Sequence, residues 1–177
     1  MFNDSFRLYF SGILRIILSY LVLFHTELSL TIKIILVYIF DLFDCINNYT
    51  LFGEYSVKKF CRGLQYSYSD KIVDTITYFL ILWYIIKTKA LDQYLITLLT
   101  ILLLFRLVGV CILLITGDNN YLYIFPNFFL ELSIVFAFFK DYIGYNVSNT
   151  ILILFVVNIV IIFKIIMEYL HHGTKNI

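Results

Sequence analysis

Long apolar runs follow one another along almost the whole of this chain. Each run approaches the ~20 residues that a helix needs to cross the hydrocarbon core of a bilayer. The chain has 177 residues and is 62% hydrophobic, whereas roughly half of a soluble domain is apolar. The sequence therefore predicts an all-α integral membrane protein, a bundle of about six transmembrane helices. The predicted spans lie at 7–25, 28–45, 70–88, 93–116, 121–140 and 147–170.

The polar connections between these runs are short, except for residues 46–69. We therefore expect a single multi-pass membrane domain over 1–177. The first run resembles a signal peptide in position, but it carries Arg15 and another span follows it at once, so we expect it to be retained. A formal net charge of +1 gives no field for binding nucleic acid.

The distribution of lysine and arginine predicts the orientation, because these residues favour the cytosolic ends of spans. With the N-terminus inside, the cytosolic side would hold more of them than the opposite side. The inner set is Arg7, Lys58, Lys59, Arg62, Lys71 and Lys175, and the outer set is Lys33, Lys87, Lys89 and Lys140. We therefore expect both termini, and the loop 46–69, in the cytosol.

Two pairs of aspartates flank that loop. Asp41 and Asp44 close the second predicted span, and Asp70 and Asp74 open the third. Spacings of i,i+3 and i,i+4 put both carboxylates of each pair on one helix face. A helix N-terminus favours negative charge, whereas a helix C-terminus disfavours it, so stability alone does not explain the first pair.

A divalent cation would explain four carboxylates at one membrane boundary, where ionised groups are costly. Hard carboxylate oxygens suit Mg²⁺ or Mn²⁺. Two such ions could clamp a diphosphate and stabilise the attacking and leaving oxygens. Asp74, one turn into its helix, could also accept a proton from an alcohol. Solvated residues at span ends are the alternative interpretation of each pair taken alone.

In these residues the chain resembles the CDP-alcohol phosphatidyltransferase family, whose motif is D-x-x-D-G-x-x-A-R-x8-G-x-x-x-D-x-x-x-D. Asp41-Leu-Phe-Asp44 and Asp70-Lys-Ile-Val-Asp74 match its two ends, between the second and third spans. The resemblance implies that Asp41, Asp44 and Asp70 bind Mg²⁺ or Mn²⁺ and that Asp74 is a metal ligand or the catalytic base. It also implies the partners: a CDP-linked lipid such as CDP-diacylglycerol, an alcohol acceptor, membrane lipids and a second copy in a homodimer.

The middle of the motif differs. Cys45 and Tyr66 stand where the family has glycine, the loop is longer, and the motif's Ala-Arg is not matched. A phosphate ligand in place of that arginine would come from Lys58, Lys59 or Arg62, and spacing does not choose among them. These departures favour the alternative of a catalytically inactive membrane scaffold that retains the fold.

Three ionisable residues fall inside other apolar runs: Arg15, Arg106 and Glu131. Such groups usually face the interior of a helix bundle. Arg106 and Glu131 could form a structural ion pair between the fourth and fifth spans. Alternatively, Arg106 or Arg15 could bind a substrate phosphate, since guanidinium suits bidentate anion recognition. A small transporter lined by these residues is a third possibility.

Overall fold

The computed structural model describes residues 4–52, 64–118, 121–144 and 147–173, with side chains described for 9–41, 68–118, 121–122, 124–144 and 152–166. All the regular structure within these ranges is helical, which confirms the predicted all-α class. The helices fall into two compact units, Met1–Leu28 with Ile32–Tyr84, and Ser29–Thr31 with Ile85–Ile177.

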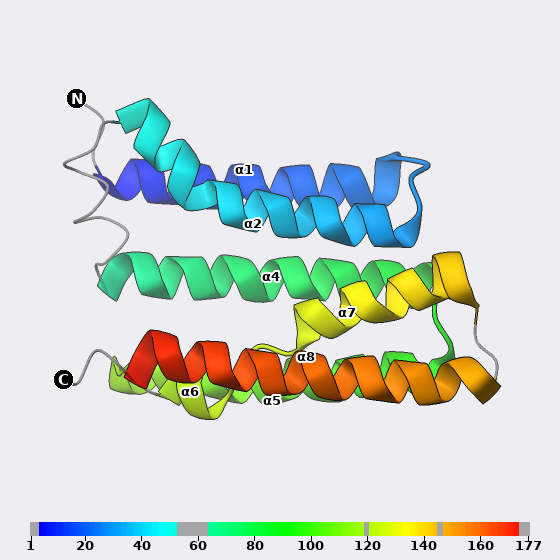
Figure 1. The fold of residues 1–177 in the computed structure, drawn as a ribbon. Coiled ribbons are helices and arrows are strands. Elements are labelled where there is room, and N and C mark those ends of the chain that lie inside the picture. Colours follow the sequence, from blue (N-terminus) through cyan, green and yellow to red (C-terminus); the bar gives the residue numbers. More distant parts are fainter. Residues whose placement is uncertain (1–3, 53–63, 119–120, 145–146, 174–177) are drawn as a thin grey trace. The chain divides into compact units, whose positions relative to one another are not determined.

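The first unit consists of α1 (Asp4–His25), α2 (Leu30–Phe52) from Ile32 onward and α4 (Leu64–Thr88) as far as Tyr84 (Figure 1). These segments contain no proline, so nothing interrupts their backbone hydrogen bonds. Gly12 of α1 lies against Val73 of α4, and a Cβ at Gly12 would come within 2.7 Å of Val73 Cγ2. The absence of a side chain there allows the two helices to approach closely.

A buried lysine joins the three helices of this unit away from the aspartates. Lys33 of α2 donates from Nζ to the carbonyl oxygen of Leu23, at 2.9 Å, and to the hydroxyl of Tyr84, at 2.8 Å. Nζ also lies 4.5 Å from the centre of the Tyr84 ring. Phe24 packs edge-on against the same ring. The aromatic cluster thus shields a charge that has polar partners on α1 and α4.

The second unit contains α5 (Gln93–Thr116), α6 (Tyr121–Ile124), α7 (Phe129–Phe138), a π-helical turn η1 (Phe139–Ile143) and α8 (Val147–Gly173). Helix α7 packs against α5 and α8, and η1 continues it. The core of this unit contains Phe129 and Phe136, which are almost completely buried. Asp141 of η1 accepts hydrogen bonds from the backbone N–H and the hydroxyl of Thr31, which belongs to this same unit.

Several predicted spans correspond directly to helices: 7–25 to α1, 93–116 to α5 and 147–170 to α8. The predicted continuous span at 121–140 is wrong, because the backbone is non-helical from 125 to 128. Pro126 lacks an N–H and disfavours helical geometry in the residue before it, so α6 ends and α7 begins anew.

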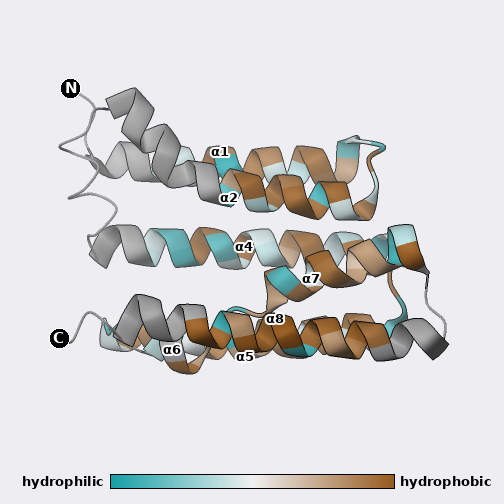
Figure 2. Cartoon of the chain, in the orientation of Figure 1, coloured by the Kyte–Doolittle hydropathy of each residue, from teal (hydrophilic) through white to brown (hydrophobic). Residues whose placement is uncertain are grey.

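One helix within the described ranges, Gln93–Thr116, is long and apolar enough to cross a membrane. Shorter apolar segments occupy Tyr9–His25 and Leu152–Ile166. In Figure 2, the described part of α8 is hydrophobic along most of its length.

Candidate metal centre

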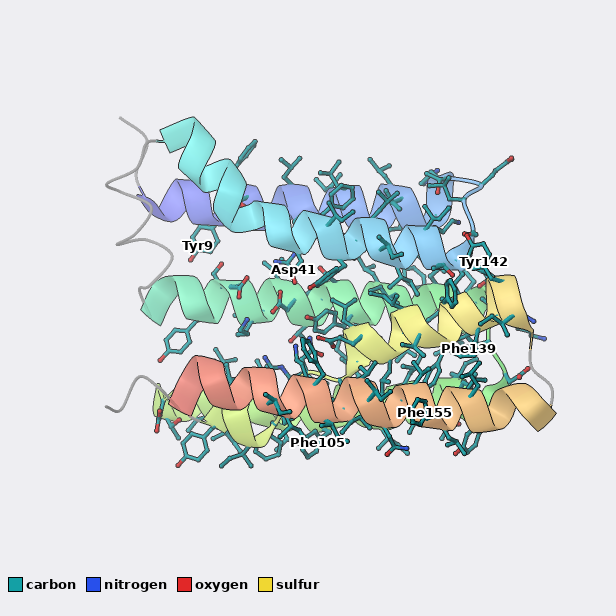
Figure 3. All side chains as sticks on the ribbon, in the orientation of Figure 1. Tyr9, Asp41, Phe105, Phe139, Tyr142 and Phe155 are labelled. Carbon is teal, nitrogen blue, oxygen red and sulfur yellow. The ribbon has the colours of Figure 1, made fainter. Side chains whose placement is uncertain are left out.

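Three of the predicted aspartates meet in the first unit. Asp41 on α2 and Asp70 and Asp74 on α4 each offer one carboxylate oxygen, and these oxygens lie within 4.8 Å of one another. The i,i+4 spacing places Asp70 and Asp74 on one face of α4. Asp41, labelled in Figure 3, lies on the side of α2 that meets this face. The side chain of Asp44, the fourth predicted ligand, lies outside the described residues.

Arg15 of α1 binds all three carboxylates. Its Nη1 lies 2.8 Å from Asp41 Oδ1 and 3.5 Å from Asp70 Oδ1, and its Nη2 donates to Asp74 Oδ1. The arginine is only 3% exposed. A buried guanidinium needs polar or anionic partners, because moving an isolated charge out of water is very costly. Arg15 is therefore the counterion of the aspartates.

Lys71 binds the other side of the same group. Its Nζ lies 2.7 Å from Asp70 Oδ2 and 3.1 Å from Asp74 Oδ2. Asp74 therefore accepts from both cations, whereas Asp41 forms its ion pair with Arg15. We call Arg15, Lys71 and the three aspartates the carboxylate cluster. With every group ionised, its two cations leave one net negative charge.

The aspartates do not lie at helix ends as predicted. Helix α2 continues past Asp41 and Asp44 to Phe52, and α4 begins at Leu64, well before Asp70. No glycine or proline follows Asp44 until Gly53, so the sequence offers nothing to stop α2 earlier. Because the helix dipole acts mainly within the terminal turn, it neither favours nor disfavours these carboxylates appreciably.

The donor chemistry of the cluster fits a divalent cation. Carboxylate oxygens are the usual protein ligands of Mg²⁺, and opposite ligands of an octahedral Mg²⁺ lie about 4.2 Å apart. Adjacent ligands lie about 3.0 Å apart, so oxygens separated by up to 4.8 Å would have to move closer together to hold one ion. One oxygen of each of these carboxylates, however, already pairs with Arg15.

The other predicted residues have different placements. Lys58, Lys59 and Arg62 lie outside the described residues. Arg106 of α5 belongs to the second unit, where it is buried and donates from Nη1 to the carbonyl oxygens of Phe125, at 2.6 Å, and Leu122, at 3.5 Å. Leu122 lies in the last turn of α6 and Phe125 directly follows that helix, so both carbonyls lack a helical partner.

The predicted pairing of Arg106 with Glu131 is wrong. Glu131 of α7 instead pairs with Lys164 of α8, whose Nζ lies 2.6 Å from Glu131 Oε1. The break at Pro126 supplies carbonyl acceptors for Arg106, so this arginine needs no carboxylate, and Lys164 comes from a helix that packs on α7. The sequence reasoning assigned no role to Lys164.

Comparison with protein-family models, curated proteins and solved structures gives no match for this chain. The resemblance to CDP-alcohol phosphatidyltransferases consequently stays a prediction, based on the two aspartate pairs and their place between helices.

Proposed function

We propose that this chain is a multi-pass membrane protein that transfers a phosphatidyl group from CDP-diacylglycerol to an alcohol and releases CMP. The observation that carries the proposal is the meeting of Asp41, Asp70 and Asp74 from two helices, with one oxygen of each within 4.8 Å of the others. Asp41 and the Asp70/Asp74 pair, three of the four aspartates that resemble the family motif, thus share one site.

The proposed membrane location is supported by the surface of the helices. Large apolar side chains are exposed on α5 and α8, among them Ile101, Ile115, Phe155 and Phe163, each more than half exposed. Phe155 is labelled in Figure 3. Extended apolar surface is unfavourable in water but is solvated by lipid. The 24 residues of α5 give a length of about 36 Å, enough for the ~30 Å hydrocarbon core.

In the proposed reaction, the hydroxyl oxygen of the acceptor forms a bond to the phosphorus of the phosphatidyl group, and the bond from that phosphorus to the CMP oxygen breaks. Asp41 and Asp70, with Asp44, would hold Mg²⁺ or Mn²⁺, which neutralises charge on the diphosphate. Asp74 would accept the hydroxyl proton or complete the ligand set. Lys58, Lys59 or Arg62 would bind a substrate phosphate.

A second candidate function is a catalytically inactive scaffold. The observation that favours it is the pairing of Arg15 and Lys71 with the same carboxylates, which neutralises most of their charge without a metal ion. In such a protein the carboxylate cluster would hold the three helices together. The two candidates differ in whether a divalent ion binds and whether CMP is released.

The deciding experiment uses purified protein in detergent with radiolabelled CDP-diacylglycerol. The acceptors are inositol, glycerol 3-phosphate, serine, choline and ethanolamine, each with Mg²⁺ or Mn²⁺. We expect CMP release with one acceptor, and a loss of ~10² or more in turnover in Asp74→Asn, which keeps the shape of the side chain but not its charge. Absence of CMP release with every acceptor and both metals would refute the transferase and favour the scaffold.

The proposed orientation has its own test. With the three native cysteines replaced, single cysteines introduced into residues 53–63, the loop between α2 and α4, and into the C-terminus are labelled in sealed membranes. We expect both positions to react only from the cytosolic side, where the aspartates and a soluble acceptor would meet. Labelling of the loop from the opposite side would reject this topology.

A further inference from the structure

The contacts of Arg15 involve one defined set of atoms. Its two terminal nitrogens face Oδ1 of Asp41, Oδ1 of Asp70 and Oδ1 of Asp74. The guanidinium therefore lies against one oxygen from each of the three carboxylates that could hold a cation. An ion that used these oxygens would occupy the same space and attract the same charges.

We propose that Arg15 is a tethered competitor of the divalent cation, so that metal binding requires its guanidinium to leave the three carboxylates. This inference rests on the metal dependence of the proposed function. It adds a group within the chain that lowers the affinity of the carboxylates for the metal ion. It assigns to Arg15 a role in setting metal affinity rather than in binding substrate phosphate.

Electrostatics makes the competition strong. A guanidinium remains protonated in proteins, so Arg15 cannot relieve repulsion with a neighbouring ion by losing its proton. Two like charges about 4 Å apart repel strongly in a protein interior, and the effect doubles for a divalent ion. The guanidinium must therefore move. Lys71, with 23% of its side chain exposed, can turn toward solvent more readily than Arg15, whose side chain is 3% exposed.

The packing of α1 holds Arg15 in this competing position. Gly12 lies three residues before Arg15, on the same face of α1, and contacts Val73 beside Asp74. Because no side chain separates the helices at Gly12, Arg15 starts close to α4 and can reach the carboxylates. The competitor is therefore fixed by backbone packing as well as by charge.

The test measures Mn²⁺ affinity without substrate, from the loss of the free-ion electron paramagnetic resonance signal. We expect Arg15→Gln to bind Mn²⁺ at least about tenfold more tightly than the wild type, because a competing charge is gone. Arg15→Lys should retain affinity near that of the wild type. Arg106→Gln is the matched control, since it removes a buried arginine whose contacts are with backbone carbonyls, and it should leave Mn²⁺ affinity unchanged.

Unchanged or weaker binding by a folded Arg15→Gln protein would overturn the proposal. Should that variant fail to fold, the wild type labelled with ¹⁵N-arginine gives a second measurement. Titration with Mg²⁺ should shift the guanidinium resonance of Arg15, assigned from Arg15→Lys, and leave that of Arg106 in place. An Arg15 resonance that does not move up to millimolar Mg²⁺ would also overturn the proposal.

Neither measurement depends on turnover. Failure of the proposed competition by Arg15 can therefore be distinguished from failure of the proposed transferase function. Protein that binds Mn²⁺ more tightly after Arg15→Gln, but releases no CMP, refutes the transferase and supports the competition. Wild-type protein that releases CMP in a Mg²⁺-dependent manner supports the transferase. If Arg15→Gln then binds Mn²⁺ with the same affinity as the wild type, the competition is refuted.

Discussion

The two cations of the carboxylate cluster are shared unequally among its aspartates. This predicts that aspartate-to-asparagine variants of the cluster lose different amounts of folding stability. The side chain of Asp74 is 9% exposed and pairs with Arg15 and Lys71, whereas that of Asp41 is 26% exposed and pairs with Arg15. Removing one partner from a buried ion pair destabilises by about 3–5 kcal/mol. Asparagine keeps one acceptor oxygen, so we expect Asp74→Asn to lower the free energy of unfolding by about 3 kcal/mol.

The expected cost of Asp41→Asn is smaller. Its one ion pair with Arg15 is partly solvated, and a hydrogen bond to a charged group contributes about 1.5–3 kcal/mol when buried. Partial exposure, together with repulsion from the Asp70 and Asp74 carboxylates, reduces this to at most about 1 kcal/mol. For a chain of this length, 1 kcal/mol changes the melting temperature by about 2–4 °C. Asp74→Asn should therefore melt about 6–12 °C below the wild type, and Asp41→Asn about 2–4 °C below it.

Thermal unfolding of detergent-purified protein measures both shifts, with a chelator present so that no divalent ion contributes. Equal shifts for the two variants would contradict the inferred sharing of cations. A larger shift for Asp41→Asn than for Asp74→Asn would refute the assignment of Asp74 as the most strongly held carboxylate.

Three further predictions concern packing and polar contacts. Gly12→Ala should destabilise by about 1–3 kcal/mol, because the added methyl group meets Val73, and Val73→Ala should restore much of the loss in a thermal melt; no recovery would contradict this contact. A double-mutant cycle of Glu131→Gln and Lys164→Met should give a coupling energy of up to about 1 kcal/mol, and a coupling of the opposite sign would disprove the pair. Arg106→Met should destabilise by about 2–4 kcal/mol, since buried carbonyls lose their donor. Arg106→Gln should lose less stability, and equal losses in the two variants would refute the hydrogen-bonding role of Arg106.

The sequence was sufficient to predict the helical class and the meeting of three aspartates. Apolar runs identify helices because the hydrophobic surface of such a helix must either be buried in the protein or face lipid. Spacing of i,i+4 puts Asp70 and Asp74 on one face by geometry alone. Asp41 joins them because α2 and α4 belong to one unit, as expected for successive helices with a shared loop.

The role of Arg15 could not be read from periodicity. It lies 59 positions from Asp74, and hydropathy does not define which way one helix turns its face toward another. The sequence does contain a usable signal: an arginine inside an apolar run needs polar or anionic partners, and the two aspartate pairs are the concentration of negative charge nearest to Arg15.

Helix ends and breaks were missed for a different reason. Hydropathy placed the ends of two spans at the carboxylates, whereas α2 and α4 continue into polar sequence, since a helix can extend beyond the apolar part of its sequence. Hydropathy also carried one span across Pro126, because it does not register a missing N–H.

The most direct test of the central claim is to locate a divalent ion at the carboxylate cluster. Crystals of the protein grown with Mn²⁺ and recorded at the manganese absorption edge would show it as an anomalous difference peak. We predict a peak bounded by Asp41, Asp70 and Asp74, with the Arg15 guanidinium no longer on their Oδ1 atoms. No peak there at saturating Mn²⁺, with Arg15 still bound to all three aspartates, would contradict both the metal centre and the proposed transferase.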